Sequence, residues 1–199
     1  MTPPFGGPYK AADSSPSVIG APLSTFALDR VSAHFPEAVV ERYVDRAGGA
    51  WAVIHADSLP KVAAFLKNDA ELEFKLFGSM DGVDRLHLAE NDPRFEVIYI
   101  LYSLKRREHV RFKVRVSEHK PVVPSLVPLF RGANWWERLT FDFYGIRFDG
   151  HPDLRRILLY EEFQGHPLRK DYALRDRQPL IPERPIKDIF RGPGTSGHS

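Results

Sequence analysis

The stretch Val110-Arg-Phe-Lys-Val-Arg-Val116 alternates apolar and basic side chains without a break. Successive side chains of a β-strand point to opposite faces. The stretch therefore predicts a strand with its valines and Phe112 in a core and its basic residues in water or against a partner. Phe95 to Leu104 is a second strand-forming run, and Lys105 to His109 suits a hairpin connection between the two. The pair predicts an antiparallel sheet.

Helical and strand-like patterns alternate upstream of this hairpin. We expect a helix that is capped by Ser24 and ends before Pro36, followed by strands at 38–44 and 51–55. A second helix is expected from Asp57 or Ser58 to about Asp69. A hairpin is expected next, with strands at 72–76 and 86–88 and a turn over Gly78 to Asp81. In the first helix, Phe26, Leu28 and Val31 are expected to face inward. The whole predicts an α+β fold of two layers, a mostly antiparallel sheet with helices on one face.

The chain changes character after the hairpin. Pro121 and Pro124 are expected to end the sheet, because proline donates no ladder hydrogen bond. Ser125 is then predicted to cap a helix that continues past Gly132 to about Phe141, and no regular period follows. We therefore expect a flexible tail over 1–22, an α+β domain over 23–145, and an extended loop with a partner-binding tail over 146–199.

Composition excludes several classes of protein. The 199 residues include no cysteine, which excludes a disulfide, a thiol nucleophile and an ordinary iron–sulfur cluster, and disfavours structural zinc. No run approaches the roughly 18 apolar residues that span a bilayer, and the Pro-, Gly- and Ser-rich N-terminus lacks the apolar core of a signal peptide. We expect a cytoplasmic chain without a cofactor of its own, which reaches a membrane only through other proteins.

The common catalytic motifs are missing from the sequence. It contains no phosphate-binding glycine loop, no Gly-x-Ser-x-Gly turn and no His-Glu-x-x-His helix. His151 and His166, each in a Gly-His-Pro tripeptide with Asp153 and Asp171 nearby, allow a metal-dependent enzyme as one hypothesis. The interpretation that we favour is a packed loop, shaped by glycine and proline, in which each histidine bonds a buried carbonyl.

Charged residues of both signs crowd the same part of the chain. They are Arg155, Arg156, Arg169 and Lys170, interspersed with Asp153, Glu161, Glu162 and Asp171. Alternating signs beside Pro and Gly turns suit a network of charge-assisted hydrogen bonds better than an anion site. On the preceding helix, Asp142 follows Arg138 at helical spacing and is expected to pair with it. We assign these residues to structure rather than catalysis.

A second hypothesis comes from the basic stretch 105–120, which holds seven lysines and arginines against two glutamates. Arg111, Lys113 and Arg115 would line one face of a strand, as in a nucleic-acid-binding ribbon. Such a ribbon also needs outward aromatic rings for base stacking, and Phe112 shares the inward face of the valines. We therefore expect a solvated or partner-facing surface and no nucleic acid.

Two segments together resemble the signature of a known family. The first is Ala133-Asn-Trp-Trp-Glu-Arg-Leu-Thr-Phe-Asp-Phe-Tyr-Gly-Ile-Arg-Phe-Asp-Gly-His-Pro-Asp-Leu-Arg-Arg-Ile-Leu158, and the second is Gly165-His-Pro-Leu-Arg-Lys-Asp171. Glu-Arg, Asp-x-x-Gly-Ile and two Gly-His-Pro turns in this order resemble the thirty-kilodalton subunit of respiratory complex I, which is the C subunit of bacterial NADH:quinone oxidoreductase. Leu139 departs from the pattern, since the family commonly has an acidic residue there.

The resemblance implies a non-catalytic peripheral-arm subunit of a proton-translocating enzyme. FMN, iron–sulfur clusters and quinone would belong to the complex. This chain would dock to the quinone-site subunit and a cluster-bearing neighbour at the cytoplasmic face of the bacterial inner membrane. The alternative is the equivalent subunit of a membrane-bound hydrogenase or of a dehydrogenase with another electron donor. The implied structural and interface residues are Glu137, Arg138, Asp142, Gly145, His151, Pro152, Asp153, Arg155, Arg156, His166, Pro167, Arg169, Lys170 and Asp171.

Overall fold

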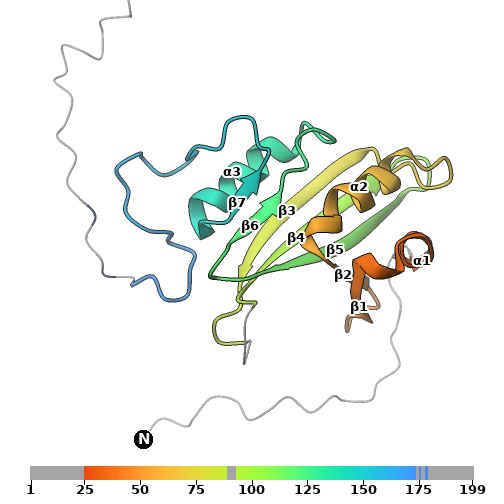
Figure 1. Cartoon of the computed structure of the whole chain (residues 1–199), viewed down its shortest axis with the longest axis horizontal. Helices are drawn as coiled ribbons and strands as arrows, with labels where there is room; N and C mark the ends of the chain where they lie inside the picture. Colours follow the sequence, from red (N-terminus) through yellow and green to blue (C-terminus); the bar gives the residue numbers. More distant parts are fainter. Residues whose placement is uncertain (1–24, 89–92, 174, 176–177, 179–199) are drawn as a thin grey trace, which may run out of the picture.

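The computed structural model describes residues 25–88, 93–173, 175 and 178 (Figure 1). Its helices are α1 (Thr25–His34), α2 (Leu59–Asn68) and α3 (Ala133–Tyr144), with two 3-10 turns, η1 (Pro36–Ala38) and η2 (Ala56–Ser58). Its strands are β1 (Val39–Val44), β2 (Ala50–Ile54), β3 (Leu76–Asp84), β4 (Phe95–Ser103), β5 (Glu108–Val116), β6 (Val122–Pro124) and β7 (Arg147–Asp149). The tail expected over 1–22, the Ser24 cap and the residues from 179 onward lie outside the described part.

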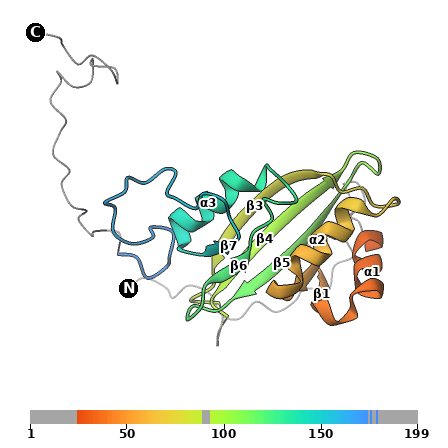
Figure 2. The ribbon, with the colours of Figure 1, turned by 45° about the horizontal axis from the view of Figure 1, so that its top comes forward.

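Five strands form the main sheet, in the order β1-β2-β5-β4-β3. Neighbouring strands are antiparallel except β2 and β5, which run parallel. The predicted hairpin is confirmed, because β4 pairs with β5 along its whole length, with Tyr99 opposite Phe112. Figure 2 shows the helices over one face of this sheet, so the α+β prediction is confirmed. No helix in the described part is long and apolar enough to span a bilayer.

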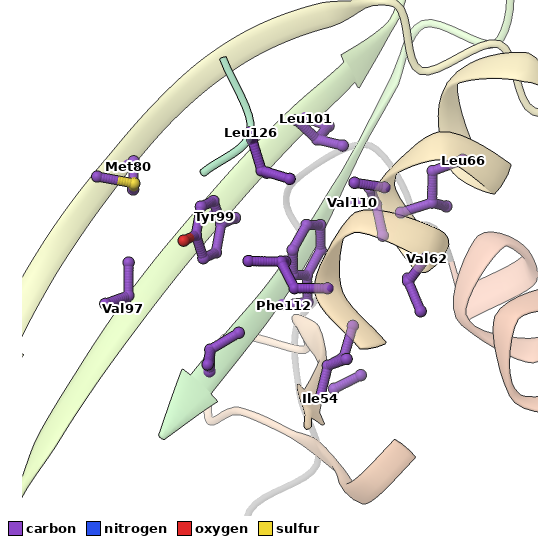
Figure 3. Packing of buried hydrophobic residues seen from close by; sticks show 14 of the residues in the cluster. Ile54, Val62, Leu66, Met80, Val97, Tyr99, Leu101, Val110, Phe112 and Leu126 are labelled. Carbon is purple, nitrogen blue, oxygen red and sulfur yellow. The ribbon is translucent and has the colours of Figure 1, made fainter. Parts of the chain in front are cut away.

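The core lies between this face and the helices (Figure 3). Tyr99 and Phe112 stack with their ring centroids 5.3 Å apart, and Val62 and Leu66 of α2 belong to the same cluster. The alternation over Val110–Val116 is confirmed, since its apolar side chains are buried and its basic ones are not. Full burial of an apolar side chain stabilises a fold by about 1.5–3 kcal/mol, so this cluster supplies much of the stability.

The hairpin predicted across Gly78 to Asp81 is wrong. β3 runs through these positions, while residues 69–75 and 85–88 form turns and irregular backbone rather than strands. Glycine here serves close packing instead of a turn: a Cβ at Gly82 would lie 2.6 Å from the ring of Tyr144 in α3. The sequence alone does not distinguish a glycine that leaves space for a helix packed against it from a glycine that forms a turn.

The inward face of α1 differs from the prediction at one position. Ala27 is buried there together with Leu28 and Val31, whereas the side chain of Phe26 is 41% exposed. Its ring instead packs against a guanidinium group, with Arg106 4.5 Å from the ring centroid. A cation–π contact of this kind stabilises an aromatic ring at the surface.

The helix predicted from Ser125 begins only at Ala133. Residues 125–132 form turns and irregular backbone, and the Ser125 hydroxyl donates to the Glu137 carboxylate instead of capping a helix. The flanking residues form a strand pair that the sequence did not indicate, β6 parallel to β7. β7 lies beyond position 145, where the sequence places the domain boundary.

Candidate functional site

Asp142, in the last turn of α3, organises the signature segments (133–158 and 165–171). Its buried carboxylate accepts hydrogen bonds from the backbone N–H groups of Ile157, Leu158 and Leu159 at 2.9–3.1 Å. The Arg156 guanidinium donates to its other oxygen at 2.8 Å. Burial alone would raise the pKa of Asp142, but these donors outweigh it and hold the pKa below its usual value. The ionised carboxylate thereby fixes the loop that follows β7.

Two arginines bind the backbone of this loop. Arg138 donates to the carbonyl oxygens of Arg155 and Arg156 at 3.2 and 3.1 Å. Arg156 donates to two carbonyl oxygens in the turn 163–165, at 3.0 and 3.2 Å. The predicted pair between Asp142 and Arg138 is wrong, because Asp142 pairs with Arg156 from outside the helix. An acidic residue four places after a basic one is also the weaker order for a helical pair.

His166 and Arg169 close the C-terminal end of α3. Gly145 ends the helix with a φ of 72°, in the left-handed region that favours glycine. A Cβ there would lie 2.5 Å from His166 Nε2 and 2.6 Å from Arg169 Nη2. His166 Nδ1 lies 2.9 Å from the carbonyl oxygen of Asp142, and Arg169 donates to that of Tyr144 at 2.7 Å. Burial lowers the pKa of His166, and its neutral ring can donate to a carbonyl that the helix leaves unpaired.

Arg94, a buried arginine outside the signature, holds the second segment. It donates to both oxygens of Asp84 and of Asp171 at 2.6–3.0 Å, and to Glu118 at 2.6 Å. Asp84 also accepts the backbone N–H of Lys170 at 2.8 Å. Burial would raise the pKa of Asp84, but these donors hold it at about 2. Sequence reasoning missed Arg94, because it is separated from Asp171 by 77 positions.

The first Gly-His-Pro turn is looser than the second. His151 Nε2 lies 3.3 Å from the carbonyl oxygen of Asn134, and its Nδ1 accepts the N–H of Asp153 at 3.0 Å. Pro152 is exposed, and Arg155 and Asp153 pair at the surface.

The two histidines do not form a shared site. They contact separate carbonyl groups, and the described residues hold no group of three or more potential metal ligands. Pro167, after the second histidine, is half-buried. The geometry agrees with loops shaped around histidine–carbonyl contacts.

Glu137 is a fully buried carboxyl group that has no ion pair in the described part of the chain. It accepts a hydrogen bond from the Ser125 hydroxyl at 2.6 Å and one from the backbone N–H of Leu126 at 2.7 Å. Burial raises its pKa to about 7, against the effect of these two donors. The side chain holds the turn between β6 and α3.

The basic residues of β5 point away from the helices, as their alternation predicts, and each has an acidic neighbour. Arg111 lies 3.5 Å from Asp45, while Lys113 and Arg115 lie 3.4 and 3.2 Å from Glu96. Their charges are therefore partly neutralised within the chain. A nucleic-acid site would need these cations for phosphates.

Aromatic rings reach this open face from the two strands predicted at 38–44 and 51–55. Tyr43 of β1 and Trp51 of β2 stack with centroids 6.4 Å apart. Arg111 lies 4.6 Å and Lys113 4.9 Å from the Trp51 ring, so the rings are covered by the chain's own cations. The arrangement offers little to nucleic-acid bases.

The signature segments bury Glu137, Arg138 and Asp142, and they expose several large apolar side chains. Trp135 is 63% exposed and Leu158 68%, with Leu168 and Tyr160 also at the surface. The Arg138 guanidinium, which binds the loop carbonyls, lies 5.2 Å from the Trp135 ring centroid. We call Trp135, in the first turn of α3, and Leu158, in the loop after β7, the signature surface.

Comparison with known proteins places these features in a family. The family model "Respiratory-chain NADH dehydrogenase, 30 Kd subunit" matches residues 52–178. The NADH-quinone oxidoreductase C subunit of Roseiflexus sp. (strain RS-1) is 45% identical over 147 residues, covering 74% of this chain and 82% of the relative. The second NADH-quinone oxidoreductase C subunit of Rhizobium meliloti (strain 1021) is 49% identical over 119 residues, covering 60% of this chain and 63% of the relative.

Two solved structures share the fold. The trypsin-resistant fragment (1-134) of Nqo5 has a TM-score of 0.56 and 29% identity, covering 64% of this chain and 99% of the fragment. A chain of the archaeal membrane-bound sulfane sulfur reductase has the same TM-score of 0.56 at 21% identity, covering 81% of this chain and 99% of its own length, and it supports the fold alone. Since the family match spans residues 52–178 and includes both signature segments, this chain belongs to the family of the thirty-kilodalton subunit of respiratory complex I.

Proposed function

We propose that this chain is a non-catalytic docking subunit in the peripheral arm of a proton-translocating NADH:quinone oxidoreductase. It stabilises the quinone-site subunit, beside a cluster-bearing neighbour, at the cytoplasmic face of the bacterial inner membrane. FMN, iron–sulfur clusters and quinone are held by those other subunits, so the enzyme activity belongs to the complex. The relatives that are named as C subunits of NADH-quinone oxidoreductase support this proposal.

The observation that carries the proposal is the signature surface. Trp135 on α3 and Leu158 on the following loop are more than half exposed, although the backbone N–H of Leu158 donates to the buried carboxylate of Asp142. Tryptophan and arginine are enriched among the residues that dominate binding at protein interfaces. A loop that is already ordered also loses little conformational entropy on binding. The surface therefore suits a stable contact with another subunit.

Several ionisable residues of the signature segments are engaged in hydrogen bonds and ion pairs within the chain. Asp142 accepts four hydrogen bonds, and Arg156 donates to Asp142 and to two carbonyl groups. Asp84 and Asp171 are engaged by Arg94. Groups used in this way position the backbone and are poorly placed to transfer protons to a substrate.

The test is the double variant Trp135→Ala and Leu158→Ala, produced in the whole complex. Truncation of such residues in an interface centre typically costs about 2 kcal/mol or more, so the yield of assembled complex should fall at least tenfold. Native gels and NADH:quinone activity of membranes give the two readouts. Normal assembly would refute the proposal.

Two controls separate docking from other effects. Leu104→Ala removes a leucine of similar exposure, 73%, in the turn after β4, and should leave assembly unchanged. Activity per assembled complex should also be unchanged in the double variant, because the chain is not catalytic. The purified chain alone should reduce no quinone.

A further inference from the structure

A groove of about 460 Å³ lies between the start of β3 and the turn before α3. Its lining includes Lys67, Lys75 and Arg131 together with Leu76, Phe77 and Leu129, and none of the described residues that line it is acidic. We call it the β3 groove. A hollow with three cations and no anion in its lining favours a negatively charged occupant.

The floor of the groove is apolar. Phe77 packs against Phe130 with ring centroids 5.8 Å apart, and Leu76 is 49% exposed. A Cβ at Gly132 would lie 3.5 Å from the Cβ of Phe77, so the turn passes directly over this side chain. An apolar side chain of a bound partner would cover this exposed apolar surface, and its burial would favour binding.

The three cations differ in the hydrogen bonds and ion pairs that they form within the chain. Lys67 donates to the carbonyl oxygen of Leu129 at 2.5 Å, and Lys75, 63% exposed, pairs with Glu73 at 2.7 Å. Arg131 is exposed and has no ion pair with a described residue. The pairing of Lys75 with Glu73 therefore leaves the rim with an excess of positive charge.

The hollow on the open face of the sheet does not share this charge imbalance. That hollow has a similar volume, about 420 Å³, but its lining pairs cations with anions. Glu96 lies within 3.5 Å of Arg85, Lys113 and Arg115. Its charges are largely balanced, so it gives no comparable reason to attract an ion.

We infer that the β3 groove docks an acidic segment of another subunit, with one apolar side chain on the Leu76–Phe77 floor and carboxylates on Lys75 and Arg131. β3 is the last strand of its sheet, so its outer edge offers backbone groups to a neighbouring segment. Residues 179–199 of this chain are an unsuitable source, because they contain more basic than acidic side chains. The inference deepens the proposed docking function, on which it rests.

The first experiment uses a pentapeptide in which four glutamates flank one phenylalanine, with both ends blocked. The purified full chain should bind it, measured by titration calorimetry at low salt, and binding should weaken as salt is added. The same peptide with glutamine in place of glutamate should bind at least tenfold more weakly. Equal binding of the two peptides would overturn the inference.

Charge reversal locates the site. The double variant Lys75→Glu and Arg131→Glu should weaken binding of the glutamate peptide at least tenfold. The double variant Lys61→Glu and Lys120→Glu makes the same change in net charge at exposed positions outside the groove, and should change binding less than twofold. Similar losses in both variants would show unspecific attraction and refute the site. Displacement of the peptide by an equal concentration of inorganic phosphate would refute a peptide site as well.

A photo-crosslinking side chain at Leu76 in the assembled complex identifies the occupant. A conjugate with an acidic segment of another subunit is the expected result, and a conjugate with lipid, or no conjugate, contradicts the inference. Peptide binding also separates the two proposals, because a Trp135→Ala chain should still bind the peptide. If that variant binds the peptide and assembles normally, the signature surface fails as the docking site while the groove stands.

Discussion

The open face of the sheet and the signature segments both carry arginines, but the two regions use them differently. On the sheet, Arg115 pairs with the carboxylates of Glu41 and Glu96, side chain to side chain. In the signature segments, Arg138 and Arg156 donate mainly to backbone carbonyl groups. A surface pair can be lost without moving the chain, whereas an arginine bound to carbonyls determines where the chain runs.

Burial makes the contrast stronger. Glu41 is 46% exposed at its side chain, so water screens its attraction to Arg115. Asp142 is fully buried, so its loss would leave donors and a guanidinium without their partner. Substitutions in the signature segments should therefore cost more stability than those on the sheet.

Asp142→Asn should have the largest effect. The neutral amide cannot accept all the hydrogen bonds of the carboxylate and leaves Arg156 without its counterion, at a cost of roughly 3–5 kcal/mol in the free energy of unfolding. Urea denaturation of the purified chain measures this, and trypsin should cut at Arg155 and Arg156 faster than in the wild type. A loss below about 1 kcal/mol would show that the loop is held by other contacts.

Arg156→Met should cost about 2–3 kcal/mol, because it unpairs Asp142 and two carbonyl groups while keeping most of the side chain's volume. Arg156→Lys, the charge-conserving control, should recover part of the loss, since an ammonium group can still pair with Asp142. Denaturation curves of the two variants provide the comparison. Equal losses in both would show that the planar guanidinium is what matters, rather than the charge.

Glu137 should make stability fall as pH rises. Its pKa is raised from 4.5 to about 7, so between these values the folded chain keeps a proton that the unfolded chain releases. The expected decrease is on the order of 2 kcal/mol, and Glu137→Gln should remove most of it. Denaturation at several pH values between 4.5 and about 7 measures the slope. Asp142, whose pKa is lowered, should lose stability in the opposite direction, as pH falls.

Arg115→Met should have the smallest effect, below about 1 kcal/mol, because its pair with the exposed Glu41 contributes little in water and the buried Glu96 keeps Arg85 and Lys113 as partners. The difference from wild type should shrink further in high salt. Differential scanning calorimetry at two salt concentrations checks this. A loss as large as that of Arg156→Met would remove the distinction between the two regions.

The strands of the sheet could be predicted where the apolar pattern lies within a short stretch of sequence. Val110 to Val116 alternates strictly, and the run from Phe95 is apolar and close in sequence, so the hairpin followed directly. β3 could not be predicted in the same way, because Gly78 and Gly82 resemble turn signals and their actual reason is packing against β4 and α3. The contact that explains Gly82 lies with Tyr144, far along the chain.

The sequence indicates which segments form the candidate site, but it does not indicate which groups in them form hydrogen bonds with one another. The order and spacing of the motifs identify the signature residues. The alternation of charged residues of both signs predicts a structural role for them. Which groups pair depends on how the loop folds back: Asp142 binds backbone groups 15–17 positions later. Arg94 belongs to no motif, and only the fold brings it to Asp171. The exposure of Trp135 likewise follows from the position of α3, which the sequence pattern does not give.

The closure of α3 by His166 and Arg169 sets an order of events during synthesis. The helix leaves the ribosome before the two residues that bond its last carbonyl groups, so its final turn stays hydrated until they arrive. The sheet is complete by then, since its last strand ends at Val116. All strands of the main sheet are therefore available in a nascent chain before the residues that bind the end of α3. The signature surface takes its final shape only in a chain that has been translated at least to Arg169.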